Sequence, residues 1–180
     1  MNASANSGEH SHAARRGKPE PVILFWVASQ MFAIAAESVQ EIRSTDSLGG
    51  AANEIDQEAV PKVRHVLEWS RRSCYVVNAG AHFGLRVTRP TLVLILRGMR
   101  VAVLVDRIDR MTEIPAVYPL PQAFAGAERR WYRGLTYIDD SVIPVVAPTG
   151  FLSSEEFAAL DRAIKPPVAP QHDMHGTAQT

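Results

Sequence analysis

The sequence predicts a mainly β protein, a β-barrel or a pair of barrels, with one short helix near the C-terminus. Short apolar runs rich in β-branched and aromatic side chains recur along the chain and are separated by turn residues. A helix-start pattern follows the last of these runs. Many short strands ahead of a single late helix are typical of small barrels.

The composition limits the classes of function. The chain has 180 residues, of which 46% are hydrophobic and 21% charged, as in an ordinary globular protein. Lys plus Arg number 19 and Asp plus Glu also 19, so no global charge draws the protein to nucleic acid or an anionic membrane. The single cysteine, Cys74, excludes an intrachain disulfide framework and favours a reducing cytoplasm. We therefore expect a cytoplasmic protein.

The two ends of the chain differ in composition from the middle. Residues 1–20 contain almost no large apolar side chain, and residues 164–180 are rich in proline and polar residues. Neither end can bury enough surface to offset its ordering entropy. The sequence therefore predicts disordered tails at 1–20 and 164–180 around one ordered unit, residues 21–163.

The start of the ordered unit could be mistaken for a secretory signal, because basic residues precede an apolar stretch. Glu20 and Pro21 separate the basic residues from that stretch, and Ser29 and Gln30 divide it into two halves of strand length. It is also too short for a transmembrane helix, which needs ~20 apolar residues. No direct membrane insertion is expected, and an exported β-rich ligand-binding domain is kept as an alternative.

The N-terminal half of the ordered unit is predicted to contain three strands and a loop. Residues 22–28 and 31–34 form a hairpin around Ser29 and Gln30. Residues 38–43 follow with a period of two, which places Val39 and Glu41 on one face and Gln40 and Ile42 on the other. Residues 44–58 contain two adjacent glycines and are predicted to be a loop with one helical turn.

The later strands are marked by turn residues. Residues 74–77 form a short strand, and residues 91–96 and 101–105 form the clearest hairpin, whose continuous apolar character predicts burial on both faces. Residues 131–137 and 141–146 complete the strands around Asp139 and Asp140. Ser153 and Glu156 have capping-box spacing, which predicts the closing helix.

No motif predicts an enzyme. The chain lacks a phosphate-binding loop, a nucleophile elbow and a dinucleotide fingerprint. Four of the six histidines lie in the predicted tails, and His65 and His82 have no carboxylate or cysteine at ligand spacing, so they are interpreted as ordinary surface or loop histidines. Cys74 is interpreted as a small core residue. We predict no catalysis, no cofactor and no metal.

Two charged segments have both a functional and a structural interpretation. Residues 129–133 interleave three arginines with Trp131 and Tyr132, a combination that binds single-stranded nucleic acid. Aromatic packing into the core explains the same residues without a ligand, so we expect no nucleic acid and keep a small β-barrel nucleic-acid-binding protein as an alternative. Asp106 and Asp109 alternate with arginines and are interpreted as a solvated strand end rather than an acid–base pair.

The run Val39-Gln40-Glu41-Ile42-Arg43, after an apolar hairpin, resembles the third strand of the bacterial chemotaxis coupling protein family CheW. Residues 102–108 resemble the Gly-x-x-Val-Asp-x-Val strand of that family, and residues 151–156 resemble its closing Leu-Leu segment and helix. The resemblance spans approximately residues 22–160. It implies two five-stranded SH3-like barrels packed side by side, and no catalysis.

The resemblance also implies a function. Members of this family are adaptors that bind the regulatory domain of the histidine kinase CheA and the cytoplasmic tip of a chemoreceptor, so that the receptor state controls the kinase. We therefore expect a non-catalytic CheW-like adaptor with these two partners. The resemblance associates the third strand with partner binding and predicts Val39, Gln40, Glu41 and Arg43 as contacts, with Val39 and Glu41 on one exposed face.

The chain departs from the family in one segment. The family usually carries an Asn-Leu-Arg-Gly turn whose arginine is linked to receptor contact, whereas residues 67–78 here read LEWSRRSCYVVN. One alignment puts Arg71 at the arginine position and the other puts Ser70 there. The next residue is then Arg72 or Arg71 instead of glycine, so the backbone cannot adopt positive φ cheaply. Ser70, Arg71 and Arg72 are the predicted contacts, and weak or atypical receptor binding is expected.

Overall fold

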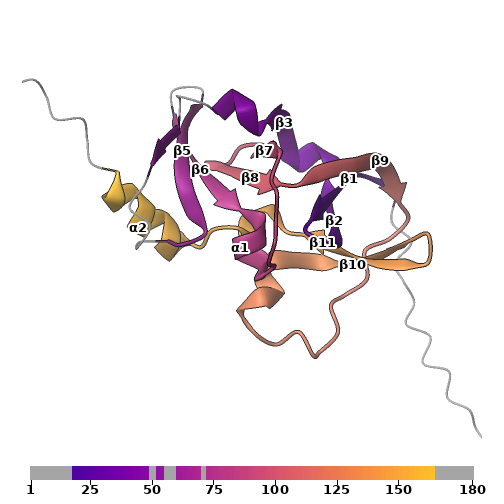
Figure 1. Cartoon of the computed structure of the whole chain (residues 1–180). Coiled ribbons are helices and arrows are strands. Elements are labelled where there is room, and N and C mark those ends of the chain that lie inside the picture. The colour runs from indigo at the N-terminus through magenta and orange to yellow at the C-terminus, as the bar shows by residue number, and fades with distance from the viewer. Residues whose placement is uncertain (1–17, 49–51, 55–59, 70–71, 165–180) are drawn as a thin grey trace, which may run out of the picture.

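The computed structural model describes residues 18–48, 52–54, 60–69 and 72–164 (Figure 1). Two β-sheets form most of the molecule. The first sheet has the strand order β10-β11-β2-β1-β9, and the second has the order β3-β7-β8-β6-β5-β4. The predicted mainly β architecture with a short C-terminal helix is confirmed, and the second sheet has one strand more than the five expected.

The elements of the first sheet are β1 (Glu20–Val27), β2 (Gln30–Ala35), β9 (Arg107–Ile114), β10 (Tyr132–Ile138) and β11 (Ser141–Val146). Those of the second sheet are β3 (Val39–Ser44), β4 (Ala52–Glu54), β5 (Val63–Trp69), β6 (Arg72–Asn78), β7 (Leu92–Leu96) and β8 (Val101–Val105). The helices are α1 (Ala79–Phe83) and α2 (Ser154–Ala163), and the 3-10 turns are η1 (Ala36–Ser38), η2 (Thr45–Leu48), η3 (Ala127–Trp131) and η4 (Pro148–Gly150).

The hairpin β1–β2 is buried on both faces. Along β1, Leu24 points into a small core with β9 and β11, whereas the neighbouring Ile23 and Phe25 belong to a large core shared with the second sheet. Alternate side chains of a strand point to opposite faces, so the apolar side chains on each face of β1 are buried in a different core. This explains why the run has no polar alternation, and the predicted hairpin around residues 29 and 30 is confirmed.

The second sheet repeats this arrangement. Leu94 and Val103 enter the shared core from β7 and β8, while Val93 and Ala102 enter a third core on the far side of the sheet. The hairpin β7–β8 is therefore buried on both faces, as its continuous apolar run predicts. Cys74 lies in the third core, where burial raises the pKa of its thiol to about 11, so its interpretation as a core residue is confirmed.

Several elements were not predicted from the sequence. Half of the residues of strand β9 are charged, yet it pairs with β1 along its length from Glu20↔Ile114 to Trp26↔Arg107. Strand β5 was also missed, because polar residues interrupt its apolar pattern. The short α1 was missed because Gly80 and Gly84 are typical of turns. Pairing with a neighbouring apolar strand can hold a polar segment in extended form, and periodicity within one segment does not report it.

The carboxylates after β8 have structural partners. Asp106 accepts hydrogen bonds from the backbone N–H of Ala28 (2.7 Å) and of Arg89 (2.9 Å). Asp109 accepts one from Trp26 Nε1 (3.2 Å) and forms an ion pair with Arg110 (2.9 Å). The interpretation as a merely solvated strand end is therefore wrong, because Asp106 joins two loops and Asp109 holds a β1 side chain.

Helix α2 closes one end of the molecule. Its predicted capping box is confirmed, with the Ser153 hydroxyl accepting from Glu156 N and the Glu156 carboxylate accepting from Ser153 N. Arg100, in the β7–β8 turn, donates two hydrogen bonds to Asp161 of α2, at 2.5 and 3.2 Å. The Tyr75 hydroxyl also donates to Asp161, and burial together with this bond raises the pKa of Tyr75 to about 12.

The N-terminal end of the described region is held to the first sheet by an ion pair. Strand β1 begins at Glu20, one residue before the predicted boundary, and Glu20 forms a two-pronged ion pair with Arg133 of β10, at 2.5 and 3.0 Å. The predicted tails lie almost entirely outside the described residues. No helix within the described ranges is long and apolar enough to cross a membrane.

The contact between Arg100, Tyr75 and Asp161 should stabilise the docking of α2. We expect Asp161→Ala to lower the free energy of unfolding by about 1–2 kcal/mol, because it removes charge-assisted bonds and leaves a buried hydroxyl with fewer partners. Urea denaturation measures the change. Arg162→Ala is the matched control, since among the described residues the Arg162 side chain bonds only the carbonyl of Ala158 in its own helix. An equal loss in both variants would contradict the prediction.

Candidate partner-binding surface

Strand β3 is the end strand of the second sheet and pairs there with β7. The register shifts by one residue between Val39, which faces Leu96, and Glu41, which faces Ile95. This β-bulge at Gln40 changes the alternation of the strand. Val39 and Glu41 therefore do not share a face, and the expectation that they form one exposed face is wrong.

Val39 belongs to the interior of the molecule. It is only 7% exposed and packs in the core shared by the two sheets. In the pairing of β3 with β7, Val39 lies opposite Leu96 and Ile42 lies opposite Leu94. Both leucines point into that core, so Val39 and Ile42 point to the same side of the sheet. Because Val39 is buried, its substitution by a charged residue would test folding rather than partner binding.

The exposed features of β3 are Gln40, Ile42 and a charged pair. Gln40 is exposed at the bulge, and Ile42 is a large apolar side chain that is 40% exposed. Glu41 and Arg43 point to the other side, where Arg43 Nε lies 2.5 Å from Glu41 Oε1. Sequence periodicity did not single out Ile42, since without the bulge it would lie opposite Val39.

The beginning of β3 is held by the neighbouring turn. The backbone N–H of Arg97 donates to Ser38 O (2.8 Å), and its guanidinium donates to Glu37 O (2.9 Å). A second guanidinium nitrogen reaches Val39 O at 3.4 Å. These bonds attach the residue that follows β7 to η1 and to the first residue of β3.

The other predicted contact segment is the β5–β6 hairpin. Ser70 and Arg71 lie outside the described residues, and only the backbone of Arg72 is described, paired with Trp69 at the beginning of β6. Because β6 runs parallel to β8, the beginning of β6 lies at the same end of the second sheet as the β7–β8 turn and the beginning of β3. The sheet order places β7, β8 and β6 between β3 and β5.

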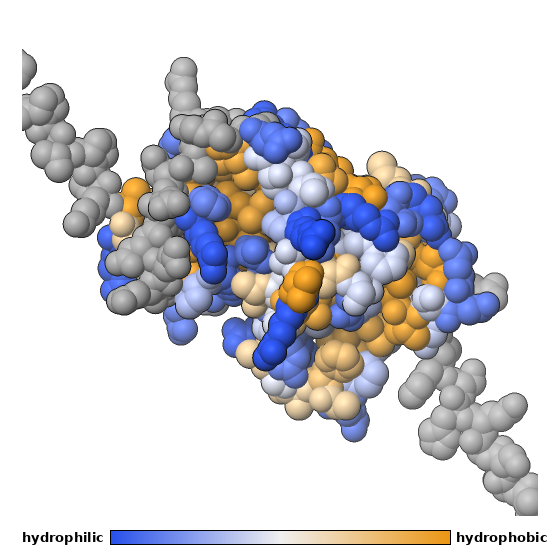
Figure 2. Space-filling model, in the orientation of Figure 1, coloured by the Kyte–Doolittle hydropathy of each residue, from blue (hydrophilic) through white to orange (hydrophobic). Residues whose placement is uncertain are grey.

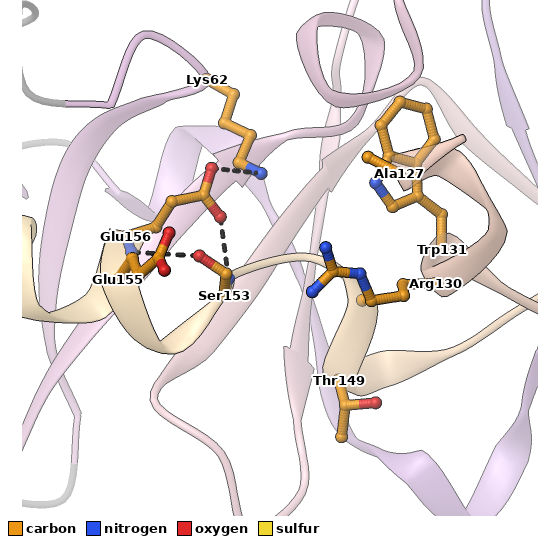
Figure 3. Close-up of a pocket in the computed structure, with 9 residues that line it drawn as sticks. Lys62, Ala127, Arg130, Trp131, Thr149, Ser153, Glu155 and Glu156 are labelled. Carbon is orange, nitrogen blue, oxygen red and sulfur yellow. Dashed lines mark hydrogen bonds and ion pairs between the residues drawn. The ribbon is translucent and has the colours of Figure 1, made fainter.

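A pocket of about 370 Å³ lies between the beginning of α2 and η3 (Figure 3). Lys62 forms an ion pair with Glu156 at 2.8 Å, and Glu156 also completes the capping box of α2. Figure 3 shows Arg130 extending toward Ser153 from the opposite wall. The Glu156 carboxylate is thus bonded to the Lys62 ammonium group and to the backbone N–H of Ser153, while the Ser153 hydroxyl accepts from the backbone N–H of Glu156, and these bonds hold the start of the helix in place.

His82 lies beside this pocket in α1 and is not the surface histidine that the sequence suggested. It is 4% exposed and packs against Phe83, Trp131 and Phe151, with ring centroids 4.8, 4.6 and 5.1 Å away. Its Nδ1 is 3.4 Å from Lys62 Nζ, and its Nε2 has no hydrogen-bond partner among the described residues. Burial, aided by the Lys62 charge, lowers the pKa of His82 to about 3.

The arginine- and aromatic-rich segment at residues 129–133 is part of the same packing. The Trp131 ring contacts His82, and the Tyr132 ring stacks on Phe83 with centroids 5.8 Å apart. The Arg133 guanidinium is bound to Glu20. Both half-buried aromatic rings thus pack against α1, in line with the structural interpretation of this segment. Among the described residues, no group of three or more His, Cys, Asp or Glu could hold a metal ion.

The fold and the polar contacts described above are those of a β-sheet scaffold, in which two sheets pack together and the clusters of polar side chains connect strands, turns and helices. Residues 21–156 match the family model described as CheW-like domain. The protein therefore belongs to the CheW-like domain family. This family consists of non-catalytic scaffolding proteins, and the chain is accordingly a scaffold or adaptor of chemotaxis-type signalling.

A solved structure shares the fold. The crystal structure of the scaffolding protein TtCheW from Thermoanaerobacter tengcongensis is similar with a TM-score of 0.61 and 15% sequence identity. The similarity covers 77% of this chain and 96% of that chain. The two sheets are thus the two SH3-like barrel units that the sequence resemblance implied. No curated protein sequence matches the chain.

The buried His82 should make stability depend on pH. Its folded pKa of about 3 lies below the ordinary value of 6.5, so the unfolded chain takes up the proton first. The stability is therefore complete above pH 6.5 and is lost as the pH falls from 6.5 toward 3, by about 1.4 kcal/mol per pH unit for one proton. Denaturation of wild type and His82→Phe over this range measures the difference.

The carboxylates titrate in both proteins, so the difference between the two stability curves is the quantity of interest. His82→Phe keeps a ring in the aromatic cluster while removing both nitrogens. Parallel curves for the two proteins between pH 6.5 and 3 would show that His82 is not the group responsible.

Proposed function

We propose that this protein couples a chemoreceptor to a CheA-type histidine kinase as a non-catalytic adaptor in the cytoplasm. Family membership supports an adaptor role in general. The observation that supports this specific proposal is the end strand β3, in which Gln40 and Ile42 are exposed within the segment that the sequence resemblance associates with partner binding.

The structure of β3 favours recognition by side chains. An exposed strand edge is a template for pairing with any extended chain, and proteins limit this with bulges and charges. Strand β3 has both devices, the bulge at Gln40 and the ion pair of Glu41 with Arg43. A partner therefore meets an exposed apolar side chain at Ile42, with the Glu41–Arg43 pair on the other side of the same strand. Charges around an apolar contact contribute specificity more than affinity.

The second partner surface in this proposal is the β5–β6 hairpin. Here either Arg71 or Ser70 stands at the position of the family arginine, and an arginine, Arg72 or Arg71, follows it in place of the family glycine. Adjacent side chains in extended backbone point to opposite faces, so at most one of these arginines occupies the usual position. We therefore propose that kinase binding is kept, whereas the receptor is bound weakly or is an atypical one bound through these arginines.

The β3 surface is tested by Gln40→Arg combined with Ile42→Arg. We expect at least about tenfold weaker binding to the kinase regulatory domain or to the receptor tip, because charge replaces an apolar contact. Calorimetric titration with each partner measures this, and circular dichroism confirms folding. The control is Met111→Arg, which changes an exposed apolar side chain of β9 in the first sheet. Unchanged affinity for both partners would rule out β3 as a contact surface.

The hairpin is tested by Arg71→Ala and Arg72→Ala separately. Loss of one charge-assisted contact costs roughly 1.5–3 kcal/mol, so we expect about ten- to a hundredfold weaker receptor binding in one variant and unchanged kinase binding in both. Titration of each variant with the receptor tip and with the kinase regulatory domain separates the two effects. The proposal for the hairpin fails if neither variant changes receptor affinity and wild type binds an ordinary receptor tip as tightly as a relative with the full turn motif.

A further inference from the structure

The segment between α1 and β7 contains an exposed and strained apolar residue. Val87 is 86% exposed, and its backbone has a φ of +61°. A β-branched residue at positive φ is a genuine outlier, with a cost of order 1–3 kcal/mol. Because the side chain is almost fully exposed, burial of Val87 within this protein contributes little to offset that cost.

The strained conformation is fixed from both sides. At the start of the segment, Leu85 N donates to Gly80 O at 2.8 Å, and a Cβ at Gly80 would overlap the Thr88 side chain that packs there. At its end, Arg89 N donates to the Asp106 carboxylate at 2.9 Å, and Thr91 N donates to Val105 O at 3.1 Å. Val87 is thus held at the tip of a loop that is anchored on α1 and on β8.

Two cations flank this tip. Arg86 and Arg89 are both exposed, and among the described residues neither guanidinium has a hydrogen bond or ion pair. The Asp106 carboxylate beside the loop is occupied by the backbone N–H groups of Arg89 and Ala28. In Figure 1 the segment crosses the face turned to the viewer, where Figure 2 shows a small hydrophobic patch between hydrophilic ones.

We propose that residues 85–89, the Val87 loop, form a contact surface that inserts Val87 into an apolar pocket edged by carboxylates on a partner protein. This inference rests on the proposed function, because the partner is the protein that binds β3. A fixed loop that presents one apolar side chain between two cations is preorganised for binding, since the ordering cost is met in the free protein. The arginines complement acidic residues around the pocket.

The position of the loop supports the same partner for β3 and the Val87 loop. The loop leads to Thr91, whose carbonyl accepts a hydrogen bond from the backbone N–H of Thr45 (2.9 Å), directly after the last residue of β3. The loop and the C-terminal end of β3 are therefore joined. Nucleic acid fits less well, because the loop contains no aromatic side chain on which a base could stack.

The test separates strain from binding. In Val87→Gly the left-handed backbone is relieved and the apolar side chain is removed. We expect a melting temperature equal to or higher than that of wild type, together with about tenfold weaker binding to whichever of the kinase regulatory domain and the receptor tip binds β3. Val87→Asn is the second variant, since asparagine also tolerates this conformation. Met111→Ala, at an exposed site of β9, is the control and should change neither property.

Charge reversal tests the two arginines beside Val87. Arg86→Glu and Arg89→Glu should each slow association with the same partner several-fold, with the effect decreasing as salt is raised.

If both Val87 variants bind with wild-type affinity, this inference alone is wrong. If the wild-type protein binds neither partner protein, this inference and the proposed function are both wrong. A lower melting temperature in both Val87 variants also overturns it, because Val87 would then be held for packing. The inference is also overturned if the wild-type protein binds a duplex DNA probe, both arginine variants lose that binding, and Val87→Gly keeps it.

Discussion

The whole structure depends on one apolar core that lies between the two sheets and belongs to both. The hairpin β1–β2 contributes Ile23 and Phe32 to it, and the hairpin β7–β8 contributes Leu94 and Val103 from the other side. Each hairpin buries its opposite face as well, in a separate smaller core. Neither sheet can therefore keep its hairpin buried without the other, and we expect the two barrel units to unfold together rather than as independent domains.

The remaining polar side chains serve this core or lie at its margins. Asp106 joins the β1–β2 turn to the Val87 loop, Arg100 and Asp161 fasten α2, and Arg97 fixes the beginning of β3. The ion pairs of Arg100 with Asp161 and of Arg133 with Glu20 connect elements far apart in the sequence. A scaffold of this kind needs a rigid frame, because the positions of its binding surfaces relative to one another decide whether two partners can be held together.

The surfaces proposed for binding lie at the end strand and the turns of the second sheet, since its interior strands are covered on both faces. Among the described strands β3 has a neighbour on one side only, and the beginning of β6 lies at one end of the sheet. The Val87 loop leads to Thr91, which bonds Thr45 directly after β3. Backbone strain at Val87 and the bulge at Gln40 are departures from regular structure on this sheet. Such departures persist where the surrounding structure fixes them, and they often occur at functional positions.

The sequence by itself determined the mainly β class, both apolar hairpins and the capped helix, because each depends on patterns within a few neighbouring residues. It also determined the family, through the order and spacing of the strand around Val39 and of the segments at 102–108 and 151–156. Only the tertiary structure decided that β9 is a strand, that His82 is buried, and that Val39 faces the core while Ile42 is exposed. The reason is the same in each case: a partner strand, a packed aromatic cluster and a bulge that shifts the register are contacts between distant residues, and local periodicity does not report them.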